Sequence, residues 1–447
     1  METTIDFQRV TRRLRCRWFS ATVIAMYLSV ETGGGAYAQA LPSDAPTHGW
    51  DKLQKQLDNR GIQLGVRYDG GIFGDLSGGL RQGTTYAGNL NLQVILDAQR
   101  LFDWPGVTVF LYGLGIHGGL PSSFVGDAQG VNSIASPAKW TLEEAWIQQN
   151  LFGNMFSVLA GRYDLNSEFY RLQSAGLFIN SSYGIGPEFS QSGREGPSIF
   201  PNTSVGARFA TKPIRGIVLR AAVLDGVPVD RSNGTQAIFA RNGGVLVVVE
   251  SVYLRRPSAS EITPRTRQFR IGRNSVGTYA GKVALGTWYY SGTFDDLAKV
   301  RPEDQAVQHH GSRGFYMLAD QTVYQDADYP ERRVTLFGQF GIGDPRVNRF
   351  GYYTGGGMTV SALIAGRKED EIGFAIAGAH NSTQYMEAQR NQGRPVQRSE
   401  VDFELTYLAQ FSSHLAVQPD LQFVRNPGTD PRIKNAVAFI LRFELSF

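Results

Sequence analysis

The sequence predicts an all-β protein, a transmembrane antiparallel β-barrel of about sixteen strands with a short helix ahead of the first strand. Two observations carry this prediction. The chain ends on a strictly alternating segment, in which large apolar residues occupy every second position up to Phe447. The connections between the expected strands alternate between long and short, as in outer-membrane barrels with long external loops, tight periplasmic turns and an even number of strands.

Residues 436–447 are expected to form the closing strand. Side chains alternate along a strand, so one face carries Val437, Phe439, Leu441, Phe443, Leu445 and Phe447. A membrane barrel turns such a face to lipid and keeps the other wet, and a tilted strand of about ten residues spans the hydrocarbon. A strand of a soluble sheet is the alternative for this segment alone. The segment resembles the closing strand of bacterial outer-membrane barrels, so the barrel-assembly machinery that reads Phe447 is an expected partner.

Residues 1–38 have the pattern of an export signal. Five Arg between positions 9 and 17 precede the apolar run 18–30, which is too short to span a membrane, and Ala36-Tyr37-Ala38 matches a cleavage motif. The single cysteine, Cys16, belongs to this leader, so no thiol chemistry is expected in the mature chain. We expect cleavage before Gln39, with a second possible site one Ala further on.

Residues 39–61 are expected to be a periplasmic segment with a short helix, and residues 62–447 the outer-membrane barrel. Trp50, Leu53 and Leu57 recur at helical spacing, and Gly61 ends the helix. Alternation then predicts strands from Ile62 and near 86–99, 106–117, 140–150, 155–165, 203–212, 216–225, 243–255, 277–291, 313–325, 332–342, 357–365, 371–381, 399–411, 414–426 and 436–447.

The long connections are expected to lie outside the cell and the short ones in the periplasm. The long ones are expected at 74–85, 118–139, 166–202, 226–242, 292–312, 343–356 and 382–398. Residues 256–275 break the pattern, because a short turn is expected there; either they form a periplasmic extension or the count is off by one hairpin. The longest loop, 166–202, is the candidate for folding inward to set the pore width, with a plain surface loop as the alternative.

The composition argues against nucleic acid as a partner but does not distinguish a membrane barrel from a secreted soluble β protein. The net charge is +4, but the leader accounts for a surplus of two, so the mature chain is too nearly neutral to indicate nucleic-acid binding. The mean hydropathy of −0.22 does not argue against a membrane barrel, because half of each strand is polar. A secreted soluble β protein has the same composition, so the strand count decides.

Several stretches resemble the carbohydrate-selective porins of Gram-negative outer membranes, the porin B family. They are residues 142–150 (LEEAWIQQN), 160–164 (AGRYD), 176–184 (GLFINSSYG), 415–422 (LAVQPDLQ) and 426–428 (NPG). The resemblance implies a sixteen-stranded barrel in the outer membrane that passes small sugars passively, surrounded by lipid and lipopolysaccharide. Which sugar passes, and whether the protein is a monomer or a trimer, stay open.

The strand phases place charged and aromatic side chains inside the barrel. A charge that faces lipid costs about 2–4 kcal/mol at the midplane, so these groups are expected to face water or each other. The expected sugar-contacting residues are Arg67, Asp69, Glu144, Trp146, Arg162, Asp164, Arg208, Arg220 and Trp288. Arg and carboxylates bind hydroxyl pairs, and indole rings stack on sugar rings. The alternatives are solvated ion pairs without a selective role and aromatic rings that only pack.

Other functions have less support in the sequence. Residues 113–118 spell a GxGxxG-type fingerprint but lead into no helix, so no nucleotide cofactor is expected. His309 and His310 have no third ligand nearby, so no metal site is expected. A non-selective porin or an adhesin-like barrel is the main alternative, and a barrel hydrolase, which needs a Ser–His–acid set at the rim, the less favoured one. We therefore expect no enzyme.

Overall fold

The computed structural model describes residues 48–228, 244–255, 279–300 and 305–447. The chain divides into two units, residues 1–48 and 49–447, and the second contains the barrel. The expected signal peptide, most of the expected loop 226–242 and the segment 256–275, which breaks the sequence pattern, lie outside the described residues. Helix α1 (His48–Asn59) ends two residues before the first strand, as the helical spacing of Trp50, Leu53 and Leu57 predicts.

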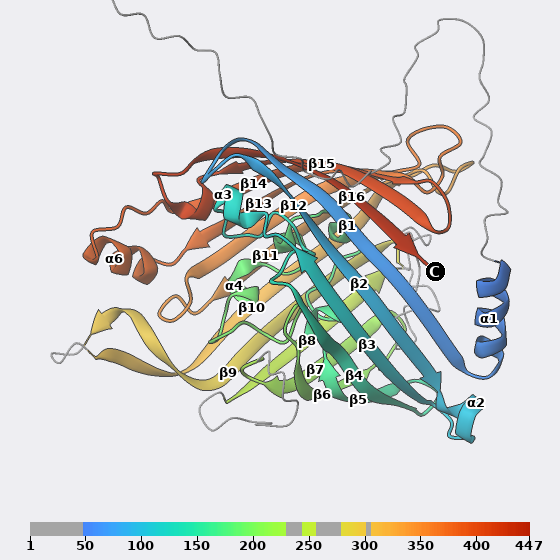
Figure 1. The fold of residues 1–447 in the computed structure, drawn as a ribbon. Helices are drawn as coiled ribbons and strands as arrows, with labels where there is room; N and C mark the ends of the chain where they lie inside the picture. Colours follow the sequence, from blue (N-terminus) through green and yellow to red (C-terminus); the bar gives the residue numbers. More distant parts are fainter. Residues whose placement is uncertain (1–47, 229–243, 256–278, 301–304) are drawn as a thin grey trace, which may run out of the picture. The chain divides into compact units, whose positions relative to one another are not determined.

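Sixteen antiparallel strands form one closed barrel, which confirms the predicted fold class. Each strand pairs with its neighbours in sequence, and β1 pairs with both β2 and β16, so the blue and red strands lie side by side in Figure 1. The strands are β1 (Ile62–Gly79), β2 (Gly83–Asp97), β3 (Val107–Gly118), β4 (Lys139–Leu151), β5 (Phe156–Tyr163), β6 (Ser204–Thr211), β7 (Ile217–Asp225), β8 (Val245–Arg255), β9 (Gly281–Val300), β10 (Ala306–Gln325), β11 (Arg333–Gly343), β12 (Phe350–Ser361), β13 (Glu371–Asn381), β14 (Ser399–Gln410), β15 (Leu415–Arg425) and β16 (Lys434–Ser446).

The predicted faces of the closing strand are confirmed. Phe439 and Leu441 are 39% and 37% exposed on the outside, whereas Ala438 and Ile440 are fully buried on the inside. The strand closes the barrel through its last residue. The Phe447 N–H donates to the Val66 carbonyl at 2.8 Å, and the Val66 N–H donates to the Phe447 carbonyl at 3.1 Å.

Three expected loops are shorter than predicted. The loop expected at 74–85 is only the turn 80–82, because β1 continues to Gly79 and β2 starts at Gly83. Strand β9 continues to Val300 and strand β10 starts at Ala306, so most of the expected loop 292–312 is a hairpin. Strand β12 starts at Phe350 rather than near 357. The extended hairpin carries polar pairs such as His309 Nε2 with Asp296 Oδ2 at 2.7 Å. A strand that is not bathed by lipid needs no apolar stripe, so its alternation is weak in the sequence.

Two connections fold into the barrel and are called the inner loops: residues 119–138, with α3 (Ser122–Val125), and residues 164–203, with η1 (Leu165–Ser167), η2 (Ala175–Leu177), η3 (Ser181–Tyr183) and α4 (Pro187–Ser190). The structure therefore places the longest predicted loop inside the barrel (Figure 1). Its apolar side chains pack on aromatic residues of the wall. The Phe189 ring, for example, stacks on Trp288 at 5.1 Å and 4°. The hydrophobic core thus lies inside the barrel, between the longer inner loop and the wall.

The remaining short elements lie in the connections. They are α2 (Ala98–Phe102), α6 (Thr383–Asn391) and η4 (Pro427–Thr429). None of the described helices is long and apolar enough to cross a membrane.

Deleting Phe447 should impair closure of the barrel. The deletion removes two backbone hydrogen bonds that join the ends of the barrel, each contributing about 0.5–1.5 kcal/mol net. We expect a smaller folded fraction after refolding into detergent, measured by heat-modifiable migration on gels. Phe447→Ala is the matched control, because it keeps both backbone bonds and loses only the ring. Equal folding of the deletion variant and wild type would contradict the closure argument.

Candidate functional site

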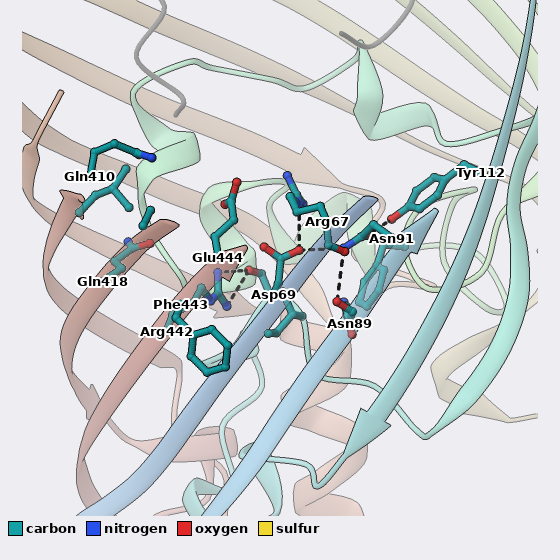
Figure 2. Close-up of a pocket in the computed structure, with 15 residues that line it drawn as sticks. Arg67, Asp69, Asn89, Asn91, Tyr112, Gln410, Gln418, Arg442, Phe443 and Glu444 are labelled. Carbon is teal, nitrogen blue, oxygen red and sulfur yellow. Dashed lines mark hydrogen bonds and ion pairs between the residues drawn. The ribbon is translucent and has the colours of Figure 1, made fainter. Parts of the chain in front are cut away.

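The inside of the barrel contains a cavity of about 200 Å³ beside the two inner loops. Its wall comes from β1, β2, β3 and from β14, β15 and β16, and the inner loops add Ser133, Ile134 and Phe200. Figure 2 shows the polar side chains of these strands pointing toward one another. The full lining is Arg67, Asp69, Asn89, Asn91, Tyr112, Ser133, Ile134, Phe200, Leu408, Gln410, Ala416, Gln418, Arg442, Phe443 and Glu444.

Four of these side chains form a hydrogen-bonded row across three neighbouring strands. Arg67 Nε and Asn91 Nδ2 both donate to Asp69 Oδ2, at 3.0 and 2.9 Å. The Tyr112 hydroxyl donates to Asn91 Oδ1 at 2.5 Å. The side chain of Arg67 is 45% exposed, whereas that of Asp69 is 7% exposed. The row therefore fixes the shape of the wall while leaving the guanidinium available to a solute.

Strand β16 adds a second pair of opposite charges, Arg442 and Glu444. Arg442 Nη2 donates to Asn132 Oδ1 at 2.6 Å, and its Nη1 donates to Ser133 Oγ at 3.3 Å. Arg442 thus ties the wall to the 119–138 loop at the edge of the cavity. The lining contains two guanidinium groups and two carboxylates, so it carries no formal net charge.

Of the nine predicted site residues, Arg67 and Asp69 line the cavity. Glu144 and Trp146 face inward, as predicted, but they are only 1% and 6% exposed. Trp146 Nε1 donates to Glu144 Oε2 at 3.1 Å, and its ring packs on Phe110 at 5.0 Å. The Asp164 N–H also donates to Glu144 Oε2, at 3.3 Å, so the start of the 164–203 loop covers this pair.

Arg208, Arg220 and Trp288 also face inward but are used to hold the 164–203 loop. Arg208 is fully buried, and its Nε lies 2.7 Å from Oε2 of Glu168 in the loop. Arg220 Nη1 donates to the Glu168 carbonyl at 3.3 Å, and Trp288 is 1% exposed beneath Phe189. The structure therefore corrects the expectation that these three residues contact a solute, because the loop stands between them and the open lumen.

The predicted positions of Arg162 and Asp164 are corrected by the strand register. Arg162 pairs with Ala145 and Val205, and Val205 is 38% exposed on the outer face, so Arg162 shares that face. Its Nε donates to Thr203 Oγ1 at 2.7 Å. Asp164 lies beyond the end of β5, where Oδ1 accepts the Asn166 N–H at 2.8 Å. A phase error of one residue moves a strand side chain to the opposite face.

The strongest lining residues that sequence reasoning missed are amides and one tyrosine. They are Asn89, Asn91, Tyr112, Gln410 and Gln418. Asn91 alternates with Leu90 and Leu92, which is the signal that places it inside a barrel. An amide offers a sugar both donors and an acceptor, so these residues suit the same chemistry as the charged candidates.

The 164–203 loop contains one buried carboxyl group without a counterion. The side chain of Glu188 is fully buried; the Tyr170 hydroxyl donates to its Oε1 at 2.9 Å, and its Oε2 has no hydrogen-bond partner among the described residues. Burial raises the pKa of Glu188 from the ordinary 4.5 to about 7. Near neutral pH the loop therefore holds this group partly protonated. Within the described ranges, no group of three or more His, Cys, Asp or Glu is arranged to hold a metal ion.

A closed sixteen-stranded barrel with loops folded into a polar lumen defines a channel protein of the porin class. The family model for carbohydrate-selective porins, the OprB family, matches residues 81–447, and the chain belongs to this family. Porin B of Pseudomonas aeruginosa is 22% identical over 473 residues, which cover 95% of this chain and 97% of the relative.

Solved structures show the same fold. Pseudomonas putida OprB in its high-pH structure superposes with a TM-score of 0.76 at 20% identity, over 89% of this chain and 97% of that chain. Its low-pH structure gives 0.56 at 17% identity, over 90% and 98%. The DcaP channel of Acinetobacter baumannii gives 0.52 at 10% identity, over 86% and 97%. At these identities the likeness concerns the fold alone.

Replacing Glu188 with Gln should remove a pH dependence from the inner loop. The folded loop binds the Glu188 proton more tightly than the unfolded loop does, so docking of wild type weakens as pH rises from about 5 to about 8. The shift corresponds to an upper limit of about 3 kcal/mol. Hydrogen exchange of the 164–203 amides, corrected for intrinsic rates, should show lost protection at pH 8.5 relative to pH 5.5 in wild type only. The same loss in Glu188→Gln would contradict the assignment.

Proposed function

We propose that this chain is a passive, sugar-selective diffusion channel in the outer membrane of a Gram-negative bacterium. We further propose that the row Arg67–Asp69–Asn91–Tyr112, together with Arg442 and Glu444, is the selective part of its path. Family membership supports the substrate class. The observation that carries the site assignment is a cavity inside a closed barrel, lined by interleaved guanidinium, carboxylate and amide groups without net charge.

This lining suits a neutral polyol. Sugar hydroxyls donate and accept, so they pair with carboxylates, amides and guanidinium groups without needing a counterion. Each such hydrogen bond contributes about 0.5–1.5 kcal/mol net, and three or four correspond to a dissociation constant near the millimolar range. A channel needs binding of this strength, because the solute has to enter readily and also leave.

A non-selective porin is the second candidate, and the inner loops argue against it. Both loops lie inside the barrel and supply lining residues, so the lumen is narrowed on the side where the cavity lies. The family consists of channels, and no enzymatic activity is proposed for this chain.

Two kinds of partner belong to the proposal. Outward apolar residues such as Leu421 and Phe439, 43% and 39% exposed, support contact with outer-membrane lipid and lipopolysaccharide. Phe447, 44% exposed at the end of the closing strand, supports recognition by the barrel-assembly machinery. Small sugars are the permeants.

The test compares two Arg→Ala variants in planar bilayers. Arg67→Ala removes a half-exposed donor from the cavity, and we expect sugar block of the ion current to weaken roughly fivefold, equivalent to about 1 kcal/mol. Removing this cation should also shift ion selectivity toward cations. Arg432→Ala is the matched control, because Arg432 is 69% exposed, pairs with Asp430 in its own connection and does not line the cavity.

Both variants are first checked for normal heat-modifiable migration, so that only inserted barrels are compared. Unchanged sugar block in Arg67→Ala, or equal weakening in both variants, would show that the selective segment lies elsewhere.

A further inference from the structure

Five carboxylates of the barrel wall accept backbone N–H groups of the inner loops. These wall carboxylates are Glu144 on β4, Glu250 on β8, Asp320 on β10, and Glu400 and Glu404 on β14, and each is at most 2% exposed. An irregular loop inside a barrel has backbone donors without strand or helix partners, and a buried carboxylate needs donors. The wall carboxylates therefore accept the hydrogen bonds that the loop N–H groups need to donate. These contacts occur at several points along the inner loops.

Glu404 holds the loop with both of its oxygens. Oε1 accepts the Ile179 N–H at 2.5 Å, and Oε2 accepts the Asn180 N–H at 3.0 Å. Asp320 uses a single oxygen. Its Oδ2 accepts the Gln173 and Ser174 N–H groups at 3.1 Å each and the Tyr279 hydroxyl at 2.9 Å.

A chain of bonds connects Glu404 to the edge of the cavity. The Ile179 N–H donates to Glu404, and the Ile179 carbonyl accepts the Ser133 N–H at 2.9 Å. Ser133 lines the cavity and accepts Arg442 Nη1 at 3.3 Å. A second hydrogen bond joins the two inner loops: the Ser181 N–H donates to the Gly130 carbonyl at 2.8 Å. The position of Ser133 therefore depends on where Glu404 holds residues 179–180.

We propose that Glu404 is a positioning residue for permeation: it fixes the meeting point of the two inner loops and thereby sets the aperture beside the Arg67–Asp69 row. The proposal rests on the proposed function, since it concerns the same path. Glu404 does not touch the solute. It acts through Ile179 and Ser133.

The number of oxygens used distinguishes Glu404 from Asp320. A Gln at position 404 presents one oxygen and one NH₂ group, and an amide nitrogen accepts no hydrogen bond. Glu404→Gln therefore loses one loop bond and places two donors against each other. An Asn at position 320 can turn its single oxygen to all three donors that Oδ2 now serves. Both variants replace a wall carboxyl group with an amide, but only Glu404 uses two different oxygens for its two loop N–H groups.

The experiment records single-channel currents of full-length Glu404→Gln and Asp320→Asn in planar bilayers, in salt alone and then with a neutral disaccharide. In Glu404→Gln we expect a second conductance level whose occupancy is roughly two- to tenfold above that of wild type, the change that one net hydrogen bond produces. Sugar block should weaken in parallel. Asp320→Asn should match wild type in both measurements. Both barrels should migrate normally before and after heating, which a general folding defect would not allow.

Wild-type currents in Glu404→Gln would overturn the proposal, because the loop position would then not depend on the second oxygen. Equal changes in both variants would also overturn it, because replacement of a wall carboxyl group by an amide, rather than loss of the second acceptor, would be responsible. The recordings in salt alone separate this proposal from the proposed function. If the sugar does not block the wild-type channel, the substrate assignment fails, while the conductance levels still report the role of Glu404.

Discussion

The interior of this barrel is governed by one constraint: two long irregular loops lie inside it, and their backbone N–H groups need acceptors away from bulk water. The wall supplies them as buried carboxylates, with Glu250 accepting from Tyr170, and Glu400 accepting from Ala128 and Gln129. Unpaired backbone donors and unpaired buried charges are each costly, so the loops and the wall stabilise each other. The position of the cavity, and the burial of most inward side chains, follow from this arrangement.

Because of this constraint, the lumen has two sectors: one holds the longer inner loop, and the other lines the cavity. Strands β8–β14 carry the carboxylates and aromatic rings on which the longer inner loop packs, such as Trp288 beneath Phe189. Strands β1–β3, β15, β16 and the end of β14 face the remaining space with groups such as Arg67, Asp69 and Arg442. An inward-facing Arg or Trp residue therefore does not by itself indicate solute contact. In the first sector such residues are buried against the loop that they hold.

The fold is set by the alternation of outward apolar and inward polar residues rather than by particular residues. A fifth of the residues are identical to Pseudomonas putida OprB, yet the structures superpose with a TM-score of 0.76. A barrel needs outward apolar residues at every second position, inward polar ones, and glycine where rings lie on the backbone. At Gly286, an added Cβ would come within 2.0 Å of the Tyr316 ring, which lies in the packed sector. Many sequences satisfy these demands, so identity falls while the architecture persists.

The sequence by itself determined the number and order of the strands, the closing role of residues 436–447 and the inward phase of Arg67, Asp69, Glu144 and Trp288. It did so because lipid imposes a period of two on every strand, which local alternation records. Only the tertiary structure decided which inward residues meet a solute. Glu144 and Trp288 are covered by a loop that folds back over distant strands. The outward face of Arg162 is set by the pairing of the short strand β5 with β4 and β6. Such long-range contacts leave no periodic trace in the sequence, whereas a one-residue shift of register is enough to reverse a face.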